Sequence, residues 1–441
     1  MIKNNIKFGS VKKNISWILI QNIYTMLLGM VITGIIARHY GTEGYGIINL
    51  AYSFVTLFTF IAVFGTNHII LNDLTEKKHP TGIILGSNLF VRIILACVSV
   101  VLSQTIALFL YTKEMNIAIF LFGINIIFNC SDIIAYFAQS KMENKYISIS
   151  KIISTTIFSI LKIIVVILKL NIMYYIFTYL IENIIYGILL IISYKKIKKD
   201  EKISFSVNKT YIKELFKKSK YYALASLMVT IYMRIDQVML GTIFLNKSVV
   251  GIYSAAVRIS EIWTFAPLAV ITSFKPVIYN SKNGSVNQYF KNYQKLFNVV
   301  SIICFIFTIC IILFGKIGIN ILYGKKYIAA FIPLIILTIG TWFGVLGNIH
   351  YIWMTAENKE KFSLIYSFVG SIINIIFNII LIPKYGIIGA AVATLIGQIS
   401  SNILIFLFIP NMRNLSKWLL QSLNPINGIN ELLRRKNDCR N

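Results

Sequence analysis

Long apolar runs recur along the whole chain, and they constrain its fold more than any other feature. Segments of about 20 mostly apolar residues, each long enough to cross roughly 30 Å of hydrocarbon, follow one another at short intervals over almost the full length. The composition agrees, since 57% of the 441 residues are hydrophobic and only 13% are charged, whereas soluble domains carry about 25% charged residues. We therefore predict an all-α membrane protein and exclude an ordinary soluble enzyme.

Short polar connections divide the apolar sequence into twelve candidate transmembrane helices. The longest connection, residues 195–219, has four lysines among its first five residues and separates six spans from six spans. We therefore expect an N-terminal six-helix lobe at 1–194, a basic cytoplasmic linker at 195–219, a C-terminal six-helix lobe at 220–410 and a basic cytoplasmic tail at 411–441. The candidate spans are residues 15–37, 45–71, 83–110, 116–140, 147–169, 172–194, 220–245, 250–279, 294–323, 328–355, 361–382 and 386–410.

The cations are distributed unevenly between alternate connections, and this distribution predicts the orientation of the chain. The sequence has 43 Lys and Arg against 16 Asp and Glu, a formal net charge of +27. By these bounds, the terminal segments and the even-numbered connections hold 26 of these cations, the odd-numbered connections hold 6, and 11 lie within the spans. Because cytoplasmic loops are enriched in Lys and Arg, we place both termini in the cytoplasm. The charge excess then needs no nucleic-acid partner.

The cysteines give no sign of a metal centre. None of the five belongs to a CxxC or CxxH spacing, which is typical of structural zinc sites, and four of them lie inside apolar runs: Cys97, Cys130, Cys304 and Cys310. We therefore expect no metal site and no bound cofactor.

Charged residues inside the spans point most directly to a functional site. Each costs roughly 2.5–3.5 kcal/mol on insertion scales, so it usually marks a transport pathway or an ion pair. Four of them lie eleven to fourteen residues on either side of Lys247, which corresponds to about 16–21 Å along a helix. Opposite charges at matched depth predict a cluster near the bilayer centre. The four are Arg234, Asp236, Arg258 and Glu261, and the other charged residues within spans include Arg92, Asp132, Lys162, Glu182 and Lys316.

Helical periodicity separates the members of this cluster. Arg234 shares a helix face with Thr230 and Gln237, whereas Asp236 is only two residues away and points to nearly the opposite side. We therefore predict that Arg234 faces a polar cavity and that Asp236 pairs with Arg258 between helices. Arg258 and Glu261, at i and i+3, can also pair within one helix. The alternative interpretation is that all four residues neutralise one another as packing contacts.

Polar stripes in both halves of the chain extend the candidate site. Their spacings of three and four residues place each set on one helix face, and Arg92 is at the right depth to pair with Asp132. The alternative is ordinary interhelical hydrogen bonding, at about 0.6 kcal/mol per bond. A further feature is Pro267, which is expected to bend the span at 250–279. The stripes are Asn125, Asn129, Asp132 and Tyr136 in the first half, and Ser367, Ser371, Asn374 and Asn378 in the second.

Three segments resemble the Wzx-type polysaccharide flippases of the multidrug/oligosaccharidyl-lipid/polysaccharide exporter superfamily. The first, residues 38–46, is similar to the family's R-x-L-G-x-E-x-Y-G turn, with Tyr40 in place of leucine. The second and most specific resembles R-I-D-x-x-M-L-G at 234–241, followed by G-x-Y-x-A-A-x-R from Gly251. The third, residues 381–391, is like the entry to the family's final helix. Together they lie in both halves of the chain, in the expected order.

The resemblance implies a fold and a substrate. The fold is MATE-like, with twelve transmembrane helices in two six-helix lobes around a central cleft that opens alternately to each side. The substrate is a polyprenyl-diphosphate-linked oligosaccharide, moved across the cytoplasmic membrane of a bacterium for O-antigen, capsule or exopolysaccharide synthesis. A polysaccharide polymerase and chain-length proteins are further possible partners.

The candidate residues suit this substrate. A diphosphate requires fixed cations, and the sugar requires amide and hydroxyl partners. Many relatives are thought to use a proton or sodium gradient, for which carboxylates are needed. The candidates are Arg234, Arg258, Arg92 and Lys162 for the diphosphate, Asn129, Asn374 and Asn378 for the sugar, and Asp236, Glu261, Asp132 and Glu182 for coupling or charge pairing.

Three other functions are alternatives to that of a polysaccharide flippase. A membrane glycosyl polymerase or ligase is disfavoured, because every outer connection has about seven residues or fewer and no sugar-transfer site can be built there. An ion-coupled drug or metabolite exporter of the same fold is expected to carry carboxylates rather than an arginine in its cavity. A flippase for another lipid-linked precursor, such as lipid II, typically has fourteen spans, two more than are counted here.

Overall fold

The chain folds into helices joined by short turns. The computed structural model describes residues 8–198, 203–282, 285–357, 359, 361–409 and 412–424, and every regular element in these ranges is helical. The prediction of an all-α membrane protein is thereby confirmed. The helices form two compact units, residues 1–230 and 231–441.

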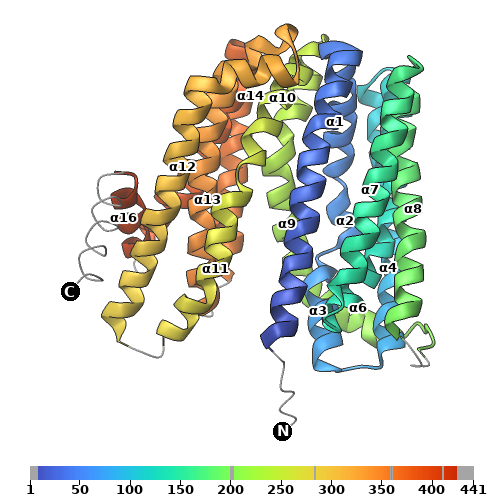
Figure 1. The fold of residues 1–441 in the computed structure, drawn as a ribbon, viewed down its shortest axis with the longest axis vertical. Coiled ribbons are helices and arrows are strands. Elements are labelled where there is room, and N and C mark those ends of the chain that lie inside the picture. Colours follow the sequence, from blue (N-terminus) through green and yellow to red (C-terminus); the bar gives the residue numbers. More distant parts are fainter. Residues whose placement is uncertain are drawn as a thin grey trace. The chain divides into compact units, whose positions relative to one another are not determined.

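In the first unit, long helices pack side by side along their lengths. The helix α1 packs against α7, and α7 against α8 (Figure 1). The helix α4 packs against α5. A buried cluster that includes Ile70, Leu85 and Phe137 holds the ends of several helices together. The elements are α1 (Phe8–Thr56), α2 (Thr59–Val63), α3 (Thr66–Glu76), α4 (Thr81–Leu110), α5 (Lys113–Phe128), η1 (Asn129–Asp132), α6 (Ile133–Ser140), α7 (Asn144–Ile167), α8 (Ile172–Lys198) and the first part of α9 (Lys209–Ile243), whose residues from 231 on belong to the second unit.

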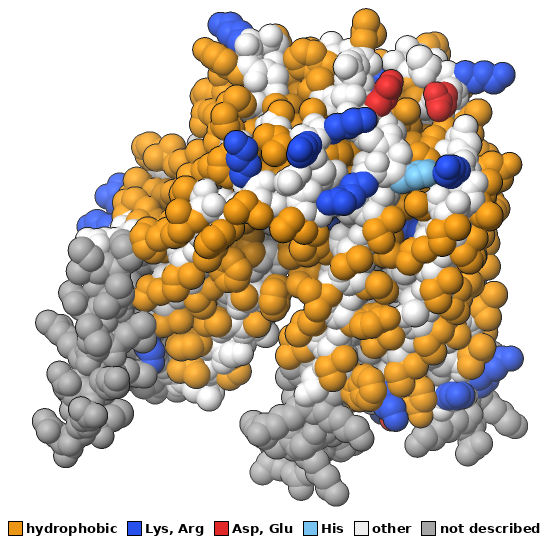
Figure 2. Space-filling view, turned by 45° about the horizontal axis from the view of Figure 1, so that its top comes forward, with side chains coloured by type: hydrophobic (Ala, Val, Ile, Leu, Met, Phe, Trp, Pro, Cys, Tyr) orange, Lys and Arg blue, Asp and Glu red, His pale blue; other side chains and the backbone are white. Residues whose placement is uncertain are grey.

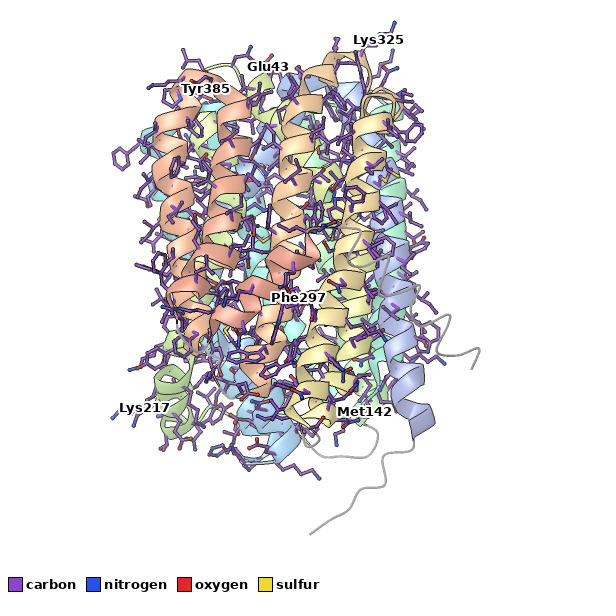
Figure 3. The ribbon with its side chains drawn as sticks, turned by 90° about the vertical axis from the view of Figure 1, so that its left-hand side faces the viewer. Glu43, Met142, Lys217, Phe297, Lys325 and Tyr385 are labelled. Carbon is purple, nitrogen blue, oxygen red and sulfur yellow. The ribbon has the colours of Figure 1, made fainter. Side chains whose placement is uncertain are left out.

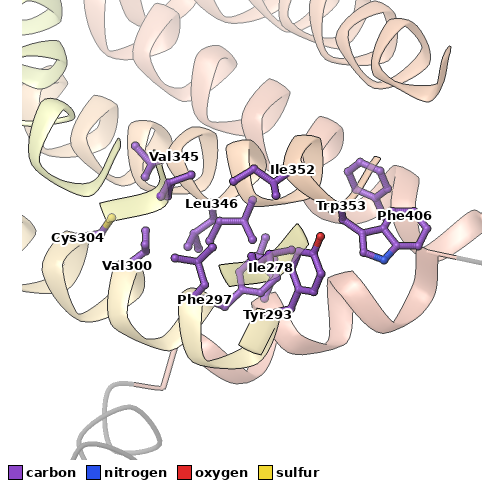
Figure 4. Close-up of a cluster of buried hydrophobic side chains, with 14 of the residues drawn as sticks. Ile278, Tyr293, Phe297, Val300, Cys304, Val345, Leu346, Ile352, Trp353 and Phe406 are labelled. Carbon is purple, nitrogen blue, oxygen red and sulfur yellow. The ribbon is translucent and has the colours of Figure 1, made fainter. Parts of the chain in front are cut away.

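In the second unit, α13 lies against α10, α12 and α14. Its core, shown in Figure 4, joins Phe297 of α12 to Leu346 of α13 and extends to Phe406. The short C-terminal helix α16 packs Leu419 into this core and Trp418 against Phe290. The elements are α10 (Ser248–Ile262), α11 (Phe265–Ser281), α12 (Val286–Leu322), η2 (Lys325–Ala330), α13 (Phe331–Ala356), α14 (Lys361–Ile399), η3 (Ser400–Leu404), α15 (Ile405–Phe408) and α16 (Arg413–Ser422). Residues 425–441 of the expected tail lie outside the described residues.

Among the described residues, ten helical segments are long and apolar enough to span a membrane. Two of them, residues 16–63 and 364–408, are 48 and 45 residues long, and a straight helix of that length measures roughly 70 Å, about twice the hydrocarbon thickness. Each contains a glycine with non-helical backbone angles, Gly41 (φ 68°) and Gly386 (φ 56°). Glycine adopts positive φ without a Cβ clash. The expected boundaries between spans one and two, and between eleven and twelve, fall at these glycines, while the count of twelve itself stays a prediction.

The ends of each unit carry the connections in the expected alternation. In the first unit, Glu43 lies at one end of the helices and Met142 and Lys217 lie at the other (Figure 3). In the second unit, Lys325 and Tyr385 lie together at one end of its helices (Figure 3). Which of these ends faces the cytoplasm stays a prediction from the charge distribution.

Large apolar side chains cover the flanks of the helices. Phe109 of α4 is 85% exposed, and Phe314 of α12 is 60% exposed. Figure 2 shows hydrophobic side chains over most of the visible flanks and several Lys and Arg side chains towards the helix ends. Exposed apolar surface on this scale is stable only against lipid. The chain is therefore a multi-pass membrane protein.

The region between the sixth and seventh expected spans is partly helical. The helix α8 continues to Lys198 and α9 begins at Lys209, so the expected linker at 195–219 contains the ends of two helices. Between them, the backbone nitrogen of Ser206 donates to the carbonyl oxygen of Gly82 at 3.2 Å. A Cβ atom on Gly86 would lie 2.6 Å from the carbonyl oxygen of Ser206. The segment 203–208 thus runs along α4 in direct backbone contact, which glycines permit.

Candidate substrate-binding site

The carboxylate of Asp236 is the centre of a hydrogen-bond network in the second unit. Asp236 is 5% exposed. The hydroxyl of Tyr253 in α10 donates to Oδ2 at 2.8 Å, and Nδ2 of Asn378 in α14 donates to Oδ1 at 2.7 Å. The hydroxyl of Thr394, further along α14, also donates to Oδ2. Three neutral donors therefore hold one buried carboxylate. Their hydrogen bonds join α9, α10 and both arms of α14, the helical segments before and after Gly386.

The prediction that Asp236 forms an ion pair with Arg258 is wrong. Within the described residues, no ion pair joins these two side chains, and Nε of Arg258 is buried without a hydrogen-bond partner. Helix geometry gives the reason. The face of α10 that carries Tyr253 packs towards Asp236. Arg258 comes five residues later, so it lies about 140° from Tyr253 around the helix axis. Matched depth alone did not indicate which face of α10 packs against α9.

Arg234 contacts Glu261 instead. Its Nη1 atom lies 4.0 Å from Oε1 of Glu261, and the two side chains are 20% and 28% exposed. The i, i+3 pair that Arg258 could form with Glu261 is likewise not formed among the described residues. As the two-residue spacing suggested, Arg234 and Asp236 have different partners: Arg234 has a long, partly exposed contact with a carboxylate, and Asp236 has short, buried contacts with neutral donors.

A break in the span at 248–281 places Glu261 at a helix end. The helix α10 ends at Ile262, and α11 begins at Phe265. Pro267 causes the break, because its ring clashes with the carbonyl group four residues earlier, that of Trp263, and its nitrogen cannot donate to it. The hydroxyl of Thr264 donates to the backbone oxygen of Glu261 at 2.6 Å. Glu261 thus has an anchored backbone and a side chain that reaches Arg234.

The predicted stripe on residues 361–382 supports the Asp236 network. Asn374 and Asn378 are fully buried, and Nδ2 of Asn378 also donates to Oδ1 of Asn374 at 3.1 Å. The arms of α14 approach closely at Gly397, where a Cβ atom would lie 3.1 Å from Cβ of Asn374. The two asparagines therefore lie where two helical arms meet, with their amides directed towards Asp236 and Thr394.

The turn between α9 and α10 is also stabilised by a cation. Nζ of Lys247 donates to the backbone oxygen of Gly241 at 2.6 Å. Partial burial lowers the pKa of Lys247. The carbonyl group at this helix end thereby gains a donor.

In the first unit, Arg92 is held by neutral partners. It is 3% exposed, and its Nε and Nη2 atoms donate to the hydroxyl of Thr66 at 3.0 and 2.9 Å. Nη2 also donates to Oδ1 of Asn67, and the guanidinium lies 5.7 Å from the ring centre of Tyr136. No ion pair to Asp132 is formed in the described part of the chain, which corrects that expectation. Asp132 ends the short 3-10 turn η1, whose tighter winding changes the helix face that the sequence spacing assigned to it.

Lys162 lies among aromatic rings. It is 7% exposed, and its ammonium group is 3.6, 4.1 and 5.2 Å from the ring centres of Phe158, Tyr179 and Tyr175. The hydroxyls of the two tyrosines are 3.1 Å apart. Cation–π attraction contributes up to about 2 kcal/mol in a desolvated site. The rings therefore offset part of the cost of a charge inside a span.

The remaining candidates of the first unit have separate environments. Glu182 forms an ion pair of 3.3 Å with Lys151 and is 12% exposed. Asn125 accepts a hydrogen bond of 2.9 Å from Asn183. Asn129 is exposed and Asp132 is half-buried. The residues of the predicted stripe on 116–140 therefore do not share one environment: Asn125 contacts α8, whereas Asn129 is exposed.

The sequence reasoning missed Tyr253, Thr394 and the rings around Lys162. Tyr253 lies inside the G-x-Y-x-A-A-x-R segment, so the motif contained the signal. Tyr175 and Tyr179, at i and i+4, share a helix face, but no pattern connected that face to Lys162. Among the described residues, no group of three or more His, Cys, Asp or Glu could hold a metal ion.

Comparisons with known proteins agree on a family and a fold. A family model described as "Polysaccharide biosynthesis protein" matches residues 11–279. The chain is 30% identical over 208 residues to a "Probable low-salt glycan biosynthesis flippase" of Haloferax volcanii, which covers 44% of this chain and 42% of that protein. The matched stretch therefore spans less than half the length of this relative.

Two solved structures share the fold. The first is "Lipid II flippase MurJ, inward closed conformation", with a TM-score of 0.74, 18% identity, and coverage of 92% of this chain and 90% of that one. The second is an inward-facing MATE family transporter of the MOP superfamily, with a TM-score of 0.70, 14% identity, and coverage of 90% and 96%. At these identities the likeness shows the fold.

Proposed function

Because this chain belongs to the polysaccharide biosynthesis protein family, we propose that it is a flippase for a polyprenyl-diphosphate-linked oligosaccharide. It moves this substrate across the cytoplasmic membrane by alternating access, for the synthesis of a cell-surface polysaccharide. The flippase name of the Haloferax relative and the fold shared with MurJ support a transport function rather than an enzymatic one.

The main support for the proposal is the partly exposed guanidinium of Arg234 within a span. A diphosphate carries at least two negative charges, and its transfer into a low-dielectric site is unfavourable without fixed cations. Arg234 lies within a span, is partly exposed, and has a carboxylate partner at 4.0 Å, which is too long for a hydrogen bond. Its planar guanidinium can bind two phosphate oxygens together. Asp236, by contrast, is already enclosed by three donors.

Other residues have secondary roles in the proposal. Arg258, Arg92 and Lys162 supply further positive charge along the spans. The exposed Asn129 supplies an amide for sugar hydroxyls, whereas the other two candidates for the sugar, Asn374 and Asn378, are enclosed in the Asp236 network in this structure. Coupling to a proton or sodium gradient uses a carboxylate. The candidates for coupling are Asp236, Glu261, Asp132 and Glu182.

The cellular setting follows from the same proposal. The chain acts in the cytoplasmic membrane of a bacterium with both termini inside, next to a polysaccharide polymerase and chain-length proteins. Residues 195–219 face the cytoplasm.

Substitution of Arg234 tests the proposed function. Lysine keeps the charge but loses the planar fork, and glutamine loses both, so we expect Arg234→Lys to retain partial activity and Arg234→Gln almost none. The assay measures surface polysaccharide in a strain that lacks the chromosomal copy, with the amount of each variant in the membrane as the control. Full complementation by Arg234→Gln would contradict the anion-binding role and favour an ion-coupled drug or metabolite exporter. Accumulation of a different lipid-linked precursor in the deletion strain would instead assign another flippase substrate.

A further inference from the structure

We infer that Glu261 is an internal competitor for the anion that binds Arg234, and that this competition sets how readily the substrate is released. The inference rests on the proposed function, since it concerns the same arginine. It gives Glu261 a role in substrate release, in addition to its place among the candidates for coupling.

The geometry of the pair suits an exchangeable contact. Nη1 of Arg234 and Oε1 of Glu261 are 4.0 Å apart, and the side chains are 20% and 28% exposed. A direct charge-assisted hydrogen bond is about 2.7–2.9 Å long. The carboxylate therefore neutralises the guanidinium without occupying its donors at close range. An anion that approaches the N–H groups of Arg234 replaces the carboxylate of Glu261 as the negative neighbour of the guanidinium.

The two members of the pair are anchored independently of each other. Next to Arg234, Asp236 is fixed by Tyr253, Asn378 and Thr394, which holds this part of α9 in place. On the other side, Thr264 donates to the backbone oxygen of Glu261 at the end of α10. Neither backbone depends on the ion pair for its position. Only the side chains have to move when the pair opens.

The break at Pro267 explains why the carboxylate lies at this depth. It ends α10 at Ile262, inside the span 248–281. Arg234 therefore has the carboxylate of Glu261 as a neighbour within the span. A substrate diphosphate must compete with this carboxylate, so a tightly bound anion can still leave.

A binding experiment with four variants tests this competition. The probe is farnesyl diphosphate, a short polyprenyl diphosphate, titrated against the purified full-length protein in lipid nanodiscs. Glu261→Gln removes the competing charge, and we expect its affinity to rise about two- to fivefold, the effect of a partly exposed ion pair, with a slower release. Glu261→Asp, whose shorter arm lies further from Arg234, is expected to be intermediate. Arg234→Gln is expected to bind weakly.

The matched control is Glu357→Gln. Glu357 forms an ion pair of 3.6 Å with Lys282 and is also 28% exposed, but it lies beyond the end of α13 and outside the spans. This variant removes the same charge from the same unit, and we expect wild-type affinity. An equal rise in Glu357→Gln and Glu261→Gln would overturn the inference, because the effect would then come from net charge.

The outcomes separate the inference from the proposed function. If Arg234→Gln binds weakly and Glu261→Gln binds no better than the wild type, Arg234 is an anion site and the competition by Glu261 is refuted. If the wild type and Arg234→Gln bind the probe equally, the proposed function itself is contradicted. A fall in the unfolding temperature of both Glu261 variants without a change in affinity assigns the pair a structural role and refutes the competition.

Discussion

The hydroxyl of Tyr253 donates a hydrogen bond of 2.8 Å to Oδ2 of Asp236, across the turn that joins α9 to α10. Asn378 and Thr394 complete the enclosure from α14. The carboxylate is thus stabilised by neutral groups, while the neighbouring Arg234 keeps a longer contact with Glu261. One helix therefore presents a buried, hydrogen-bonded acid and a partly exposed cation only two residues apart.

This difference predicts separate consequences for the two residues. Asp236→Ala leaves three buried donors without their acceptor, and we expect a loss of about 1–3 kcal/mol in unfolding free energy for each donor that stays unsatisfied. Arg234→Ala removes a partly exposed group, so we expect little loss of protein but no export. The measurements are the amount of protein in the membrane fraction and its thermal unfolding in detergent. Equal losses in both variants would indicate that Arg234 is also a packing residue.

The contact between α4 and residues 203–208 predicts a glycine effect. A Cβ atom on Gly86 would lie 2.6 Å from the oxygen and 2.7 Å from the nitrogen of Ser206, so Gly86→Ala should displace this segment and destabilise the protein by about 1–3 kcal/mol. The matched control is Gly318→Ala in α12, where a Cβ atom meets nothing within 4 Å. That variant should be neutral or more stable by up to about 1 kcal/mol, since alanine favours helices. Comparable unfolding temperatures for the two variants would contradict the close contact.

The aromatic surroundings of Lys162 predict that its charge is not needed for folding. Lys162→Met keeps an unbranched side chain against Phe158 and Tyr179 but removes a charge from a span, so we expect the unfolding temperature to stay level or rise. Export should fall, because the ammonium group is one of the proposed diphosphate partners. A large drop in unfolding temperature with a parallel drop in export would assign Lys162 a structural role.

The charge distribution predicts the topology. A reporter fused after Lys199 should report a cytoplasmic location, and one fused after Glu43 should report the outer side, because Lys and Arg concentrate on the cytoplasmic side. Paired reporters that are active only inside or only outside provide the measurement. An outer location for the fusion after Lys199 would contradict both the orientation and the expected cytoplasmic linker.

The membrane class, the turns near Gly41 and Gly386 and the break near Pro267 could be predicted from the sequence, whereas the breaks at 57–58 and 64–65 inside the second expected span could not. Apolar length is a local property, because every span must cover the same hydrocarbon thickness. The break near Pro267 and the reversals at Gly41 and Gly386 are local as well, since they follow from a missing donor and from permitted backbone angles. The spacing of Asn374 and Asn378 likewise fixed that they share one helix face.

The partner of each charged residue, by contrast, depends on how distant helices pack. Asp236 binds Asn378 and Thr394, which are 142 and 158 residues away, and Arg92 binds Thr66 rather than Asp132. Depth can be counted along a helix, but partners depend on how each helix is rotated about its axis when it packs. Tyr253 and Arg258 lie about 140° apart around α10, so the rotation of that helix about its axis decides which of them faces α9, and packing between distant segments sets that rotation.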